Sequence, residues 1–593
     1  VGSEMCIRDR SAEEENKEIQ TFSSDVVNSG TCGENAKWTY YADKTLVISG
    51  SGPMKSYTYD WREYISTAPW MAYRSRIKKI VVEDGITSIG DYAFKECGYG
   101  LPGQCTALEE IVIGNDVEEI GKEAFYACNP ITVEKIQVVS MGSGIKRIGE
   151  DAFRTTGRIK RVEIPNLESW MQIDFEGEAS TPMWGGAFPR NNDEVEFYVG
   201  GVRIKNLVIP QGVTAIKDYT FWNCRLNSVT WPEQTSIRKL GKGAFAYNDF
   251  NRITIPDGIN EIGIHSFGCC INLSELKVPD SVHTMGGSAF AGCSSLKSVS
   301  LSQSLTEISK GAFYGCSALQ SVVLPEVITN IGESAFNRCE SLTNIEIPQG
   351  VTSIGTIAFA ECSSIQNVKI PDSVRTIGVG AFRNCSSITT MVIPNSVQSI
   401  GSSAFYNEEK LESVQLSENI QTIEESTFKN CSNLKSISVP SSVESIGKNA
   451  FENCTSLTAI SYGKKVAEIG ESAFSGCSQL TSVEIPELVK VIRKTSFSGC
   501  TKLEQVELPS GVETIEDSAF ARCEVLQDIV LPDGVKEIGS SAFSGCVGLK
   551  EIQIPDGITT ISQRCFQNCS GLTQIVIPKT ITNIEGFAFE QCK

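Results

Sequence analysis

The chain repeats one unit at a fixed interval. A phenylalanine recurs every 23 residues from Phe267 to Phe589, which gives fourteen equal intervals. Units of this kind stack on their neighbours, because one unit alone cannot bury its apolar side chains. The period therefore predicts a solenoid. Looser copies precede the regular run, and their anchor residues are Phe94, Phe125, Phe153, Phe221 and Phe245.

Each unit reads Ala-Phe-x-x-Cys-x-x-Leu-x-x-Ile-x-Ile-Pro-x-x-Val-x-x-Ile-Gly. The two isoleucines of the Ile-x-Ile step leave the same face of a short strand, and the proline after them removes a backbone donor and ends that strand. Two further apolar positions, such as Val535 and Ile538, turn inward before the next Ala-Phe. We therefore expect 23-residue coils with one short parallel β-strand each.

This pattern resembles the BspA-type leucine-rich repeat, which occurs in surface proteins of bacteria and of some parasitic protists. The similarity covers most of residues 79–593, and the spacing, the proline, the glycine and the Ala-Phe pair all agree in many copies. Residues 31–78 resemble the segment that often precedes such repeats. The resemblance implies a curved solenoid displayed outside the cell, with a role in adhesion or ligand recognition. It does not specify a ligand.

The chain divides by composition into six segments. The first ten residues, "VGSEMCIRDR", have no initiating methionine and resemble translated adaptor sequence, and the chain stops in mid-repeat at "AFEQCK", so we expect a fragment. The segments that we predict are an adaptor scar (1–10), a polar unstructured lead-in (11–30), an N-terminal β cap (31–78), irregular repeats (79–165), a non-repeat insert (166–201) and regular repeats (202–593).

The cap and the insert carry most of the tryptophans. In the cap, two strands joined by a turn at 42–44 are predicted to turn four side chains inward, and we expect the cap to cover the open end of the first coil rather than to form an aromatic pocket. Those four residues are Trp38, Tyr40, Leu46 and Ile48.

The insert contains Trp170, Trp184 and Phe188, followed by a hairpin signal at Gly200-Gly201. A scaffold role is favoured for it. If the rod has a local contact site, however, we expect these three aromatic residues to form it, because loops carried on a rigid scaffold often bind partners.

Seventeen of the 22 cysteines lie three residues after an anchor phenylalanine. This spacing indicates a column with one thiol per coil, whereas disulfide frameworks and zinc sites need thiols that converge. We interpret the column as small apolar core residues. Asn248 and Glu408 replace cysteine in two coils, from which we infer that the column lies near an edge. Cys97 and Cys105 flank an eight-residue insertion; one of them is surplus to the column, and the two can form a local disulfide in an oxidising compartment.

Composition and motifs exclude several classes of function. The formal charge of −19 repels nucleic acid and anionic lipid. No apolar run approaches the ~18 residues that span a bilayer. The chain has only two histidines and no nucleotide-binding or zincin motif, so we predict neither an enzyme nor a cofactor.

The outward side chains of the predicted strands therefore carry the functional prediction. They are polar, of mixed sign and without aromatic rings, which favours broad protein contact, with Lys277, Glu346 and Lys369 among the candidate contacts. We expect an extracellular or cell-surface protein that binds host or neighbouring-cell surface proteins or extracellular matrix. The alternative is a passive stalk that presents another domain. The complete stripe is Lys277, Ser300, Val323, Glu346, Lys369, Val392, Gln415, Ser438, Ser461 and Glu484.

Overall fold

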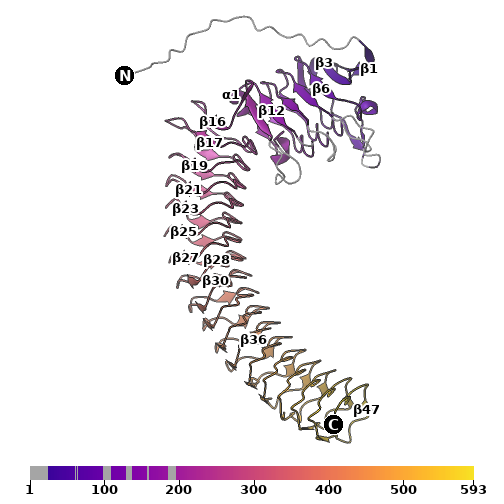
Figure 1. The fold of residues 1–593 in the computed structure, drawn as a ribbon, viewed down its shortest axis with the longest axis vertical. Helices are drawn as coiled ribbons and strands as arrows, with labels where there is room; N and C mark the ends of the chain where they lie inside the picture. Colours follow the sequence, from indigo (N-terminus) through magenta and orange to yellow (C-terminus); the bar gives the residue numbers. More distant parts are fainter. Residues whose placement is uncertain are drawn as a thin grey trace. The chain divides into compact units, whose positions relative to one another are not determined.

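The computed structural model describes residues 25–60, 62, 65–97, 108–128, 136–156, 159–183 and 195–592. Over these residues the chain forms two compact units, divided after Pro165. Each unit is a stack of coils, and α1 (Leu167–Trp170) is the one α-helix in the described part of the chain (Figure 1). The predicted solenoid is confirmed.

The first unit begins with an antiparallel cap. β2 (Asn35–Tyr41) pairs with β3 (Thr45–Pro53), and the four side chains predicted to face inward are all buried. β3 also pairs in parallel with β6 (Lys79–Val82), so the cap continues directly into the coil stack. The predicted lead-in needs correction, because β1 (Val26–Thr31) is an edge strand on β2. Its side chains are mostly exposed, so the sequence carries no burial pattern that would reveal it.

The coils of the first unit continue through further short strands, and two 3-10 helices flank the repeats. The remaining elements before the regular coils are β4 (Tyr59–Asp60), β5 (Ile65–Ser66), η1 (Met71–Tyr73), β7 (Ile86–Ile89), β8 (Glu110–Ile113), β9 (Glu119–Ile120), β10 (Val138–Ser140), β11 (Arg147–Ile148) and β12 (Arg161–Ile164) in the first unit, and β13 (Asp174–Phe175), η2 (Glu178–Ser180), β14 (Glu196–Val199) and β15 (Val202–Arg203) in the second. The predicted hairpin is confirmed: β14 and β15 pair antiparallel, and Gly200 and Gly201 both have positive φ, as a tight two-residue turn requires.

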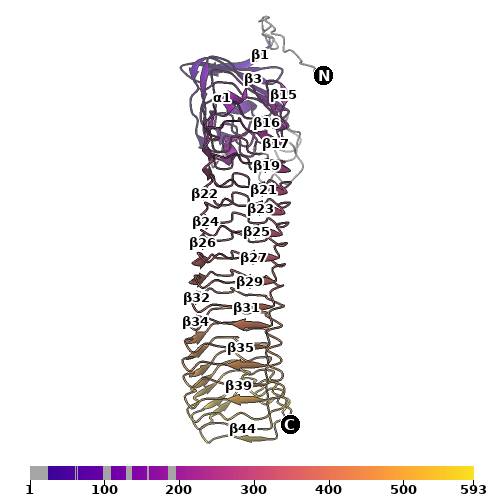
Figure 2. The same cartoon turned by 90° about the vertical axis from the view of Figure 1, so that its left-hand side faces the viewer.

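The coils of the second unit carry two columns of short parallel strands rather than one (Figure 2). Ladder A lies at the predicted Ile-x-Ile step. Each three-residue strand begins one residue before the first isoleucine, so that isoleucine is the central residue of the strand and faces the core, as Ile345 does in β27. Ladder B follows the proline turn and consists of two-residue strands. The apolar positions that flank ladder B are three residues apart, not two, so the sequence pattern does not indicate a strand. The strands of ladder B form because their backbones pair with the coil stacked next to them.

Ladder A comprises β16 (Asn206–Val208), β17 (Ser228–Thr230), β19 (Arg252–Thr254), β21 (Glu275–Lys277), β23 (Ser298–Ser300), β25 (Ser321–Val323), β27 (Asn344–Glu346), β29 (Asn367–Lys369), β31 (Thr390–Val392), β33 (Ser413–Gln415), β35 (Ser436–Ser438), β37 (Ala459–Ser461), β39 (Ser482–Glu484), β41 (Gln505–Glu507), β44 (Glu551–Gln553) and β46 (Gln574–Val576).

Ladder B comprises β18 (Lys239–Leu240), β20 (Glu261–Ile262), β22 (Thr284–Met285), β24 (Glu307–Ile308), β26 (Asn330–Ile331), β28 (Ser353–Ile354), β30 (Thr376–Ile377), β32 (Ser399–Ile400), β34 (Thr422–Ile423), β36 (Ser445–Ile446), β38 (Glu468–Ile469), β40 (Val491–Ile492), β42 (Thr514–Ile515), β43 (Glu537–Ile538), β45 (Thr560–Ile561) and β47 (Asn583–Ile584).

A third ladder joins the coils along the Ala-Phe turns, and we call it the turn ladder. Residues two before and two after each anchor phenylalanine have positive φ, as Ser288 (57°) and Gly292 (74°) do. This is why serine, asparagine and glycine recur there. The backbone N–H of Phe290 donates to the carbonyl of Ala312 in the next coil, at 3.0 Å. Every later coil repeats this bond.

The core is a stack of anchor rings. Between Phe267 and Phe589 successive ring centroids lie 5.2–5.9 Å apart, and the rings are nearly parallel. From Phe94 to Phe566 the anchors are completely buried. Offset stacks of this kind add to the free energy gained from burying the rings. One ring per coil therefore couples each coil to its two neighbours.

The cysteine column lies inside the core. Except for Cys97 and Cys224, each thiol of the column donates to the carbonyl of the anchor phenylalanine in the preceding coil, as Cys454 Sγ does to Phe428 O at 3.2 Å. The inference that this column lies near an edge is wrong, because Asn248 and Glu408 are 1% and 0% exposed. Asn248 replaces the thiol as a donor, with its Nδ2 at 2.8 Å from Phe221 O. The column is thus a column of hydrogen-bond donors as well as core filler.

Candidate interaction surface

Lys277, Glu346 and Lys369 end strands β21, β27 and β29 of ladder A, and all three side chains are exposed. Glu346 lies directly beside Lys369 in the parallel register. The full predicted stripe is exposed in the same way, because the third residue of each ladder A strand points away from the core. The structure therefore puts these three candidates on one continuous face.

Trp170 lies inside the insert and not on its surface. Its side chain is 1% exposed, its ring contacts Phe175 and Phe197, and its indole N–H donates to Thr220 O at 2.7 Å. The expectation that Trp170 contacts a partner is corrected by this burial. The other two aromatic candidates, Trp184 and Phe188, lie outside the described residues.

The cysteine pair suggested as a disulfide is only half described. Cys97 is completely buried, and this burial raises the pKa of its thiol. Cys105 lies outside the described residues, so the pairing stays a prediction. No disulfide joins any two of the cysteines that the structure describes.

A second outward column, not singled out from the sequence, runs beside the predicted stripe. It is formed by the first residue of each ladder A strand from β23 to β39, and we call it the neutral column. All nine side chains are exposed and none is charged, in a chain with 123 charged residues (52 basic plus 71 acidic). Its members are Ser298, Ser321, Asn344, Asn367, Thr390, Ser413, Ser436, Ala459 and Ser482.

Charged positions lie on both sides of the neutral column. Before it, Arg252 and Glu275 occupy the corresponding places and form an ion pair at 2.8 Å; beyond it, the uncharged Gln505 of β41 is followed by Asp528 and Glu551. Charged groups lose hydration when a partner covers them, which is why the centres of interfaces are depleted in charge. The nine coils from β23 to β39 therefore offer the part of ladder A that a protein surface can cover with the smallest desolvation cost.

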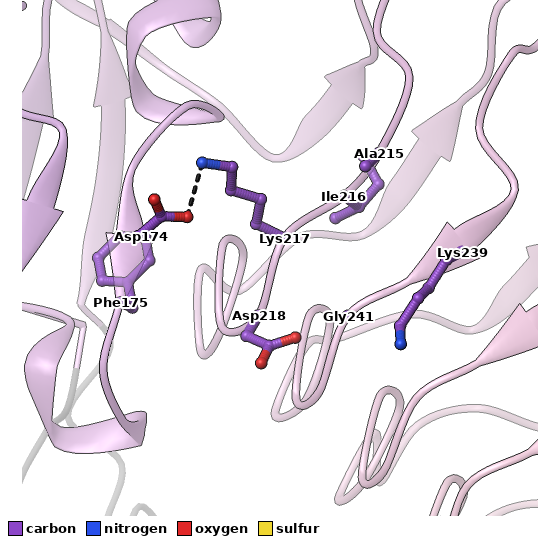
Figure 3. A pocket seen from close by; sticks show the side chains of 8 residues that line it. All are labelled: Asp174, Phe175, Ala215, Ile216, Lys217, Asp218, Lys239 and Gly241. Atoms are coloured by element: carbon purple, nitrogen blue, oxygen red, sulfur yellow. Dashed lines mark hydrogen bonds and ion pairs between the residues drawn. The ribbon is translucent and has the colours of Figure 1, made fainter.

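A cleft of about 280 Å³ lies where the insert meets the first regular coils (Figure 3). Lys217 Nζ donates to Asp174 Oδ1 and to Gln172 O, both at 2.6 Å. Lys239 pairs with Glu261 at 2.7 Å, and Asp218 Oδ1 accepts from a backbone N–H. The charged side chains that line this cleft are thus engaged within the chain. We interpret the cleft as the seam that fixes the insert, and ladder A as the stronger candidate.

The described ranges lack two further kinds of site. No group of three or more histidine, cysteine, aspartate or glutamate side chains there is arranged to hold a metal ion. None of the helices in the same ranges has the length and apolar character needed to cross a membrane.

Comparison with known families identifies the repeat. The family model of the BspA type leucine-rich repeat region, which holds six copies, matches residues 71–177, 194–318, 260–389, 378–504 and 490–593. These matches cover most of the chain. The chain belongs to the BspA-type leucine-rich repeat family. No curated protein matches it.

Solved structures similar to this BspA-type chain include bacterial leucine-rich repeat proteins. One, from Bacteroides ovatus ATCC 8483, is 33% identical with a TM-score of 0.51, over 54% of this chain and 83% of that one. A leucine-rich cell surface protein from Faecalibacterium prausnitzii A2-165 is 25% identical with a TM-score of 0.32, over 63% of this chain and 87% of that one. Repeat solenoids present extended surfaces, and protein recognition is the class of function that the BspA-type family suggests.

Proposed function

We propose that this protein is a surface-displayed or secreted adhesion or recognition protein. It binds proteins of a neighbouring or host cell, or of the extracellular matrix, through the exposed face of ladder A. The location outside the cell is the one that the family implies. The observation that carries the proposal is the neutral column: nine consecutive coils expose uncharged side chains, eight of which carry a hydroxyl or an amide, on a chain whose net charge is −19.

The binding energy is expected to be spread over many coils. Compact interfaces are dominated by a few buried tryptophan, tyrosine or arginine side chains, and neither outward column of ladder A contains any between β23 and β39. A single substitution such as Lys369→Ala should then change the dissociation constant by less than about tenfold. Clustered copies should bind much more tightly than one copy, because each additional contact forms within an assembly that is already bound.

The test places charge on two faces of neighbouring coils. The binding variant is Thr390→Glu with Ser413→Glu, both in the neutral column. The matched control is Thr376→Glu with Ser399→Glu, which makes the same chemical change at exposed positions of ladder B. Each protein is displayed on beads, and its binding to cells and matrix proteins is measured beside an unrelated acidic protein.

The proposal expects the ladder A variant to lose at least tenfold in bead binding while the ladder B control stays close to the natural protein. Equal losses in both variants would move the site away from ladder A. If beads that carry the natural protein bind no better than the acidic control, the recognition proposal fails and the passive stalk takes its place.

A further inference from the structure

The residue four positions before each anchor phenylalanine forms a column along the second unit, and we call it the glycine column. From the coil of Phe245 onward most of its members are glycine. The exceptions are Ser309, Glu424, Arg493, Glu516, Ser562 and Glu585.

Glycine at this position lets two coils approach closely. The N–H of Gly378 donates to Ile354 O of the preceding coil at 2.8 Å. A Cβ at Gly378 would lie 2.5 Å from the backbone nitrogen of Thr356 and 2.6 Å from the carbonyl carbon of Gly355. Backbone atoms of a stacked coil cannot yield as a flexible side chain does. A side chain that follows a glycine in this column is therefore expected to separate the two coils on the ladder B side.

The interruptions of ladder B follow the glycine column. Ladder B breaks into separate sheets after β22, β32, β38 and β43. At each of these four boundaries, a glycine in one coil is followed in the next coil by a residue with a side chain. Within residues 195–592, from the coil of Phe245 onward, these four residues are the only members of the glycine column whose N–H does not donate to the preceding coil as the N–H of Gly378 does. The four residues are Ser309, Glu424, Arg493 and Ser562.

The two remaining exceptions show what the contact depends on. Glu516 follows Arg493 and Glu585 follows Ser562, so in both cases the preceding coil already carries a side chain at this place. Their N–H groups donate to Ile492 O at 2.8 Å and to Ile561 O at 2.9 Å, as glycine does. A break therefore follows a change from glycine to a larger residue, and not the larger residue itself.

The serine boundaries differ from the other two. Ser309 Oγ donates to Met285 O and Ser562 Oγ to Ile538 O, each at 2.5 Å, so a hydroxyl replaces the lost N–H bond. Glu424 and Arg493 make no such bond among the residues from 195 to 592. Arg493 instead reaches Glu468 at 3.2 Å and Glu516 at 3.3 Å. These ion pairs lie at the surface, where they contribute little to stability.

The boundary between Gly470 and Arg493 lacks both the backbone bond and the hydroxyl bond that replaces it at the serine boundaries, and we call it the crease. Ladder A is interrupted here as well, because β37 and β39 do not pair. A hollow of about 420 Å³ opens between them, lined in part by Ser461, Tyr462 and Glu484. The turn ladder stays intact, with the N–H of Phe474 at 2.8 Å from Ser496 O. On one side of the crease the backbones stay joined, and on the other they are apart.

We infer that the glycine column divides the second unit into stiff blocks and that the crease is a hinge. The unit bends there about the intact turn ladder, and the Arg493 side chain spans the opening. Bending changes the curvature of ladder A between β37 and β39 without breaking a backbone bond. The ladder A and ladder B bonds that resist bending at other coils are absent at the crease.

The first experiment creates a break. Gly378→Ser is compared with Val379→Ser, a matched control at the next, exposed position. Native Ser309 and Ser562 show that the fold accepts serine in this column. Residue-resolved hydrogen exchange should show the amide at position 378 exchanging at least about tenfold faster in the first variant and unchanged in the control. Unchanged protection at 378 in Gly378→Ser would overturn the role of the glycine column.

The second experiment measures the hinge. Spin labels carried by noncanonical amino acids are placed at 438 and 507, across the crease, and in a second protein at 323 and 392. Both pairs are 69 residues apart on exposed ladder A positions. The distance distribution should be broader for 438/507, and Arg493→Gly should narrow it by restoring the close approach. Equal widths for the two pairs, or a broader distribution in Arg493→Gly, would overturn the hinge.

Discussion

The indole N–H of Trp170 donates to the backbone carbonyl of Thr220, which directly precedes the anchor Phe221. Trp70 does the same in the first unit, donating to Ala93 O at 2.9 Å directly before the anchor Phe94. In later coils this carbonyl accepts the N–H of the preceding anchor phenylalanine. Among the described residues of each unit, no anchor phenylalanine precedes the first coil, so a tryptophan supplies the missing donor. The insert therefore acts as a second cap.

Trp170→Phe tests the capping bond. The ring is kept and the N–H is lost, so the Thr220 carbonyl is left buried with one donor fewer. The free energy needed to open the first coil of the second unit should fall by about 1–3 kcal/mol. Hydrogen exchange around residues 167–225 measures this, and the coils beyond 300 should keep their protection. Trp70→Phe is the matched control, with its effect confined to the start of the first unit. A global loss of protection from Trp170→Phe would contradict the local role.

Phe405→Ala tests the anchor stack. Phe405 is completely buried, with its ring centroid 5.7 Å from that of Phe382 and 5.5 Å from that of Phe428. The cavity should destabilise these coils by about 3–5 kcal/mol. Because coupling runs mainly between neighbours, exchange should rise in residues 380–430 and stay slow beyond 500. Tyr406→Ala, at the next position, is not part of the stack and should cost much less.

Cys454 tests whether the thiol column works through hydrogen bonds or through packing alone. Cys454→Ala removes the donor to Phe428 O and should destabilise the coil by about 1–2 kcal/mol. Cys454→Ser keeps a donor, so its stability should be closer to that of the natural protein. Thr156 in the first unit is a precedent, because its hydroxyl donates to Phe125 O at 2.8 Å. Urea unfolding, with hydrogen exchange at residues 428–454 as the probe, ranks the stabilities of the variants. If alanine is tolerated better than serine, packing alone explains the column.

The parts of the fold that were predicted from sequence are the periodic ones. The solenoid, the buried face of the cap and the exposed stripe at Lys277, Glu346 and Lys369 each follow from a regular spacing. Ladder B was not predicted, because its strands form only by pairing with an adjacent coil. The neutral column was missed for a different reason: its signal is an absence of charge over nine coils, which is visible only when the coils are aligned.

Isolated residues were harder to place than repeated ones. Trp170 was interpreted as a contact because an aromatic residue in an irregular segment has no period that gives its direction. The pair Trp-Met at 70–71 recurs at 170–171 and is the signal that relates the insert to the cap. Asn248 and Glu408 were placed near an edge on polarity alone. Asparagine, threonine and cysteine can all donate a hydrogen bond, and that shared property explains why the column accepts them when buried.

Glu408 is the most unusual member of the column. Its side chain is completely buried, Oε1 accepts the N–H of Cys385 at 2.7 Å, and Oε2 has no partner among the described residues. Among the described residues, the titratable groups that interact with it are the thiols of Cys362, Cys385 and Cys431, and no cation does so. Burial raises the pKa of the Glu408 carboxyl well above its usual value. Burial in the folded coil therefore favours the neutral form of this carboxyl.

Glu408 should make its coil less stable as the pH rises. Because its folded-state pKa exceeds the unfolded value of about 4.5, the favourable contribution is complete below pH 4.5 and is lost as the pH rises from there toward the folded pKa, by at most about 1.4 kcal/mol per pH unit. Glu408→Gln removes the titration and keeps a donor, so its advantage over the natural protein should grow from pH 4.5 to pH 7. Hydrogen exchange in residues 382–431, corrected for the intrinsic effect of pH, measures the difference. Glu409→Gln, one residue along and exposed, is the control and should show no such trend. A stability difference between Glu408→Gln and the natural protein that stays constant from pH 4.5 to pH 7 would show that this carboxyl is not held neutral by the fold.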